Sequence, residues 1–60
     1  MGKYRVNFKK QENPADKKEY GIIVEADSLE RAEELALSAI QQNGKGFLRA
    51  NDIIKIEQIA

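Results

Sequence analysis

The chain has 60 residues, with ten basic and ten acidic side chains and no His, Cys or Trp. One hydrophobic core normally serves a chain of this length, so residues 1–60 should form a single small domain. The lack of Cys and His removes disulfides, thiolate nucleophiles and the common general base near neutral pH. We therefore expect no enzymatic activity and no cofactor.

The apolar runs of the sequence are short. Ile22-Ile23-Val24 is as long as any of them and is far shorter than a membrane span. The first residues lead into alternating polar and apolar side chains rather than into an apolar signal region. We expect no contact with a membrane and a location in the cytoplasm.

The N-terminal residues alternate between apolar and polar side chains with a period of two. This period predicts a strand over residues 3–9 with one buried face and one solvated face. The buried face consists of Tyr4, Val6 and Phe8. The solvated face consists of Lys3, Arg5, Asn7 and Lys9.

A second strand is predicted over residues 19–26. Its period is again two, and the three consecutive β-branched residues 22–24 favour a strand over a helix. Between the two strands, residues 10–18 include Asn13-Pro14 and almost no apolar side chain. This composition predicts a polar connection.

A helix is predicted over residues 28–43. Asp27 or Ser28 can accept the unpaired amide hydrogens of its first turn, and Glu30 stands three residues after Asp27, as in a capping box. Asn43-Gly44 predicts the helix end, because Gly readily adopts the left-handed conformation that often follows a helix. The apolar stripe consists of Leu29, Ala32, Leu35, Ala36, Ala39 and Ile40.

A last strand is predicted over residues 53–59, which completes an α+β domain in the order β-β-α-β. We expect a three-stranded antiparallel sheet in the order 2-1-3, with one helix packed on one face. A parallel pair of the second and third strands is the alternative. The first arrangement is favoured because the first strand carries the large side chains suited to a central position beneath the helix.

The sequence of the last strand does not decide which of its isoleucines face the core. Ile54 and Ile56 face one way, whereas Ile53 and Ile59 face the other. The expected core consists of Tyr4, Val6, Phe8, Ile22, Val24, Leu29, Ala32, Ala36, Ala39, Ile40, Ile54 and Ile56.

Acidic residues gather where the helix begins. Oxygen ligands suit hard cations, but acidic side chains in the first turns of a helix are also favoured by its dipole, and the ordered spacing of a calcium loop is missing. We therefore expect no metal site among Glu25, Asp27, Glu30, Glu33 and Glu34. The segment Gly44-Lys45-Gly46 is too short for a phosphate loop.

A nucleic-acid surface is the second functional hypothesis. Its candidate residues lie on the solvated sheet face and at the end of the first connection. They are Lys3, Arg5, Asn7, Lys9, Lys17 and Lys18. The zero net charge argues against this hypothesis. So does the expected burial of Tyr4 and Phe8 beneath the helix, because proteins that bind single-stranded nucleic acid need exposed aromatic rings.

A protein-interaction surface is the favoured hypothesis, because many apolar residues lie outside the expected core. The candidates are Ile23, Ile53, Ile59, Phe47 and Leu48. Such residues mark an interface or a satellite cluster beneath the loop. Both outer strands are open to strand addition, so a protein partner or a homodimer is expected.

The run from Val24 to Ala36 is similar to the strand-to-helix joint of many short bacterial and phage proteins. This resemblance implies a capped amphipathic helix and names no family. The sequence therefore predicts a non-catalytic, phage-like interaction or regulatory module, with nucleic-acid binding through the basic sheet face as the alternative.

Overall fold

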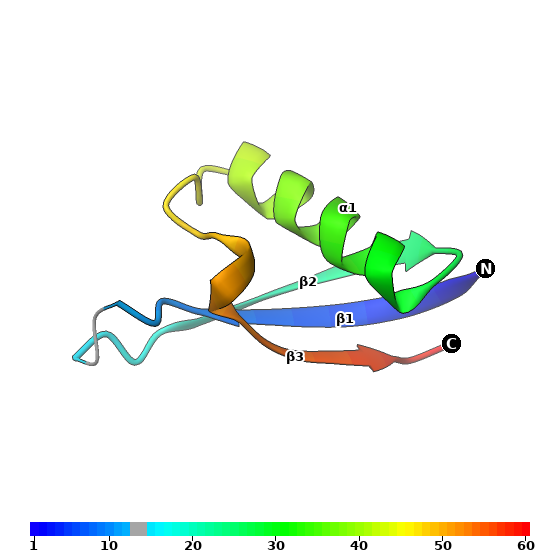
Figure 1. Cartoon of the computed structure of the whole chain (residues 1–60), viewed down its shortest axis with the longest axis horizontal. Coiled ribbons are helices and arrows are strands. Elements are labelled where there is room, and N and C mark those ends of the chain that lie inside the picture. The colour runs from blue at the N-terminus through cyan, green and yellow to red at the C-terminus, as the bar shows by residue number, and fades with distance from the viewer. Residues whose placement is uncertain (13–14) are drawn as a thin grey trace.

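The computed structural model describes residues 1–12 and 15–60, in which three strands, an α-helix and a 3-10 turn follow one another. They are β1 (Gly2–Lys9), β2 (Glu19–Ala26), α1 (Leu29–Gln42), η1 (Ala50–Asp52) and β3 (Ile53–Gln58). The strands form an antiparallel sheet in the order β2-β1-β3, with α1 against one face (Figure 1). The predicted fold is confirmed, and the parallel alternative is wrong. Asn13-Pro14, expected in a polar connection, lies outside the described residues.

β1 is the central strand because it carries the largest buried side chains. Tyr4, Val6 and Phe8 all lie on its α1 side, as their alternation predicts. The face of α1 that meets them is formed by Ala32, Ala36 and Ile40. These residues are four positions apart, a spacing that places them on one face of a helix. The small alanines allow α1 to lie close to the sheet.

The helix ends follow local backbone chemistry. The Ser28 hydroxyl accepts a hydrogen bond from the backbone N–H of Arg31 at 3.2 Å and caps the first turn. The capping box expected between Asp27 and Glu30 is wrong, because the cap is Ser28 and the residue three positions later is Arg31. At the other end Gly44 has φ of 86°, the left-handed conformation predicted for it.

The phase of β3 is decided by an irregularity in its pairing with β1. Lys55 lies opposite Asn7 and Ile53 lies opposite Phe8, so the register shifts by one residue between them. Ile53 and Ile56 therefore both pack against the core, although a regular strand would point them to opposite faces. Ile54 is the extra residue and is 44% exposed, so its expected place in the core is wrong. Ile53, expected at an interface, instead packs against the core.

Leu48 completes the core from the loop after α1. Its side chain is fully buried against Phe8, Ala36 and Ile40, so its expected place at an interface is wrong. The loop turns back because the Gln41 side-chain amide donates a hydrogen bond to the Leu48 carbonyl oxygen at 2.7 Å. Leu48 lies in the main core and not in a satellite cluster.

Leu29 is 48% exposed, which contradicts its expected place in the core. It opens the first turn of α1, outside the row of Ala32, Ala36 and Ile40 that meets the sheet. Ala39 is only half-buried at the margin of that row. The predicted apolar face of α1 is thus wider than the row of residues that the sheet buries.

Candidate functional site

The sheet face opposite α1 is a charged surface in which cations of β1 face carboxylates of β2. Lys3 lies opposite Glu25, and Lys9 lies opposite Glu19. Directly opposed residues of an antiparallel pair lie on the same face with their Cβ atoms about 5 Å apart. Both β1 lysines therefore have an acidic neighbour on β2.

In the middle of this open face, two cations share one carboxylate of β3. The Arg5 guanidinium lies 3.3 Å from a Glu57 carboxylate oxygen on β3, and the Lys55 ammonium lies 3.9 Å from the other oxygen. The structure does bring together the candidate nucleic-acid residues Lys3, Arg5, Asn7 and Lys9. Their charge is locally balanced, so the surface lacks the basic excess that phosphate binding needs.

Lys18 lies apart from that face. Its ammonium nitrogen is 5.4 Å from the centroid of the Tyr20 ring, and Tyr20 packs against the core beneath α1. Lys18 was expected at the end of the first connection, and its side chain lies on the α1 side beside Tyr20 rather than with the cations of β1. Lys17 is exposed before β2 begins.

The remaining candidate interface residues form no single apolar patch. Ile23 is 53% exposed on β2, whereas Ile59, also exposed, follows β3. The charged side chains of the central strand β1 lie between these two outer strands. Phe47, 43% exposed, contacts Tyr20 and so belongs to the α1 side. The structure thus separates Ile23, Ile59 and Phe47 into three places.

An open depression of about 540 Å³ lies beside Ile23 on the outer face of the sheet, where Gly21 provides no side chain. Its other lining residues are Arg5, Asn7 and Ile22. A Cβ atom on Gly21 would lie 3.2 Å from the side-chain amide nitrogen of Asn7, tighter than ordinary van der Waals contact. The glycine therefore keeps this hollow open, and Arg5 lies on its wall.

The outer edges of the sheet differ. β2 pairs with β1 along all of its residues from Glu19 to Ala26, without a register shift. β3 is shorter and its pairing is interrupted beside Ile54. Bulges and short strands discourage further pairing, so β3 is the protected edge. No other segment of the described chain pairs with the outer edge of β2.

An aromatic and cationic cluster lies at the end of the molecule where α1 finishes. The rings of Tyr20 and Phe47 meet edge to face with their centroids 5.7 Å apart. The ammonium groups of Lys18 and Lys45 lie 5.4 and 5.7 Å from the Tyr20 centroid. We call these four residues the Tyr20 cluster. Sequence reasoning missed it, although the period of two between Lys18 and Tyr20 indicated a shared face.

Asp52 holds the loop of this cluster in place. Its carboxylate accepts hydrogen bonds from the backbone N–H groups of Gln11 at 3.0 Å and Arg49 at 2.9 Å, and lies 3.6 Å from the Lys10 ammonium. The Gln11 N–H contributes most to holding the pKa of Asp52 below its ordinary value, with smaller contributions from Arg49 and Lys10, while burial opposes them.

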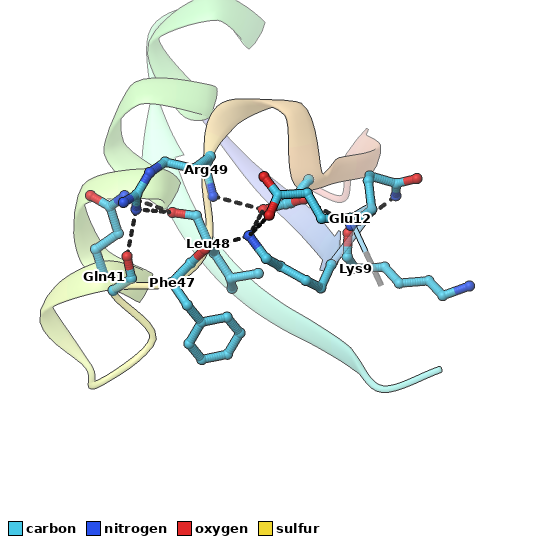
Figure 2. A network of polar contacts seen from close by, with 10 residues as sticks. Lys9, Glu12, Gln41, Phe47, Leu48 and Arg49 are labelled. Carbon is cyan, nitrogen blue, oxygen red and sulfur yellow. Dashed lines mark hydrogen bonds and ion pairs between the residues drawn. The ribbon is translucent and has the colours of Figure 1, made fainter. Parts of the chain in front are cut away.

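Lys10 connects this buried carboxylate to the aromatic pair, because its ammonium also donates a hydrogen bond to the Phe47 carbonyl oxygen at 2.9 Å. In Figure 2 the Phe47 ring projects away from this polar network. Sequence reasoning did not identify Asp52. The available signal was its position three residues after Arg49, which suits a capping box at a short helical turn.

Residues 1–12 and 15–60 contain no group of three acidic, His or Cys side chains arranged to hold a metal ion. No helix in the same part of the chain is long and apolar enough to cross a membrane. Comparisons with protein-family models, curated proteins and solved structures find no match to this chain.

Proposed function

We propose that the protein is a non-catalytic interaction module that forms a homodimer by pairing β2 with β2 of a second copy. The observation that carries the proposal is the regular, uncovered edge of β2, which runs from Glu19 to Ala26 and bears the exposed Ile23. An edge of this kind offers unpaired backbone groups to another strand. Ile23 adds apolar area beside those groups.

A two-fold axis at Ile23 gives an antiparallel register with complementary side chains. Ile23 then lies opposite Ile23 of the second copy, and Gly21 lies opposite Glu25 of the second copy. The hollow beside Gly21 has room for that carboxylate and has Arg5 on its wall. An axis at Ile22 would place Glu19 opposite Glu25, two like charges that both lie within β2, and directly opposed like charges destabilise a sheet. With the axis at Ile23, Glu19 meets only Asp27, which follows the end of β2.

The same register explains why a second copy suits this edge. A two-fold axis repeats each favourable contact, so the apolar Ile23 pair lies at the centre and the Glu25 and Gly21 contact occurs twice. Directly opposed residues of antiparallel strands share a face, so both α1 helices lie on one side of a continuous sheet. Backbone pairing provides the affinity, and these side chains provide the register.

Light scattering at tens of micromolar protein tests the proposal. The wild-type chain should have twice the 6.8 kDa chain mass. Ile23→Lys should have the single mass, because it places two like charges at the two-fold axis. Ile54→Lys, which adds the same charge at another exposed isoleucine, should remain dimeric. A wild-type chain of single mass, or a dimeric Ile23→Lys variant, overturns the proposal.

A further inference from the structure

We propose that the Tyr20 cluster binds single-stranded nucleic acid, with a base on the exposed Phe47 ring and the phosphates on the surrounding cations. This surface lies on the α1 side of the sheet, on the face opposite the one that carries Ile23, although Tyr20 itself belongs to β2. It therefore adds a second binding activity to the proposed homodimer.

The first support is the geometry of the rings. Phe47 is 43% exposed, and its ring meets the half-buried Tyr20 ring edge to face. One aromatic ring thus rests on the domain while the other faces solvent. Bases stack on such a ring largely irrespective of sequence.

The second support is the pairing state of the cations. Arg5 and Lys55 lie close to Glu57, and Lys10 lies close to Asp52. The ammonium groups of Lys18 and Lys45 have no carboxylate within ion-pair distance in the described chain. Charges held near a ring without a carboxylate remain available to phosphates.

The third support is the fixed position of the loop that carries Phe47. Lys10 donates a hydrogen bond to the Phe47 carbonyl oxygen, and the next residue, Leu48, is fully buried. Asp52 accepts hydrogen bonds from the backbone on both sides of this contact. Because the loop is already ordered, binding loses less conformational entropy than it would with a free loop.

The charge distribution favours a short strand. The acidic residues Glu25, Asp27, Glu30, Glu33 and Glu34 lie around the beginning of α1. The loop that carries Lys45 and Phe47 instead follows the end of α1 (Figure 1). Phosphates at the beginning of α1 would be repelled. A duplex would hide its bases from Phe47, and an acidic peptide would use the cations but leave the ring without a base.

Fluorescence anisotropy with a labelled strand of about eight thymidines tests the proposal, since a site of this kind spans a few nucleotides. The wild-type chain should bind at low salt and weaken steeply as salt rises. Phe47→Ala should weaken binding about fivefold or more through loss of stacking. Lys18→Gln combined with Lys45→Gln should also weaken binding, and should reduce the salt dependence.

Two controls make this test specific. Lys55→Gln removes an exposed cation of the open face and should leave binding unchanged. Phe47→Leu keeps an apolar side chain without a π-face, so binding as tight as wild type would exclude stacking and overturn the proposal. Failure of the wild-type chain to bind at low salt, or equal binding of a duplex, also overturns it. Displacement by polyglutamate as effective as by unlabelled strand would assign the site to acidic peptides instead.

Discussion

Asp52 accepts a hydrogen bond from the backbone N–H of Gln11, which joins η1 to the residues that follow β1 across 41 positions of the chain. The same carboxylate accepts the Arg49 N–H. A group that is 3% exposed and bound to two amides and an ammonium serves as an internal anchor for the loop before β3. Three predictions follow from this anchor, from the core beside it and from the turn after α1.

Replacement of Asp52 by Asn should lower the free energy of unfolding at pH 7 by about 1–3 kcal/mol, because two partly buried hydrogen bonds lose their charged acceptor. The pKa of Asp52 is lowered on folding, so its stabilisation is present above the unfolded-state pKa of about 3.9. It is lost as the pH falls through the lower folded-state pKa.

Urea denaturation at pH 7 and at about pH 2 checks this prediction. The difference in unfolding free energy between wild type and Asp52→Asn should shrink at the lower pH. Asp16→Asn provides a control, because the Asp16 carboxylate accepts the Lys18 backbone N–H near the surface. An unchanged difference for Asp52→Asn at the two pH values would contradict the anchor role.

Leu48→Ala should cost about 2–5 kcal/mol of stability, because it opens a cavity in a fully packed site. A domain of this size has a total stability of about 3–5 kcal/mol, so the variant should be largely unfolded at room temperature. Leu29→Ala removes the same atoms from a half-exposed position and should cost much less. Circular dichroism during thermal denaturation measures both. Equal losses would show that Leu48 is not a core residue.

Gly44→Ala should lower the free energy of unfolding by about 1 kcal/mol, because φ of 86° is unfavourable for a residue with a Cβ atom. Gly46→Ala is the matched control. An added Cβ at either glycine meets nothing within 4 Å, but only Gly44 has a positive φ in the described chain. Chemical denaturation should therefore show the loss of stability for Gly44→Ala and a much smaller effect for Gly46→Ala, and equal effects would contradict the assignment to backbone strain.

Sequence patterns alone predicted the three strands, the helix and the favoured order of the sheet, but not η1. The alternation of Tyr4, Val6 and Phe8 identified a strand with one buried face, and the fourfold spacing of Ala32 and Ala36 identified the inner face of α1. Both patterns are local, because the period of each element is set by its own backbone geometry. Their combination made β1 the central strand, and the sheet order followed.

Tertiary structure decided the features that depend on contacts across the chain. The bulge at Ile54 exists because Ile53 and Ile56 both pack against the core, which no alternation within β3 could reveal. Leu48 is buried because its loop folds back beneath α1. Both positions depend on packing against distant residues, which a local period does not encode.

The candidate sites divide in the same way. The cations of β1 were correctly assigned to the solvated face, but the carboxylates that balance them lie on β2 and β3 and approach only after the strands pair. Tyr20 and Phe47 are far apart in the sequence, and the loop after α1 brings their rings together. Local sequence determined which face a side chain occupies, whereas long-range pairing decided its neighbours.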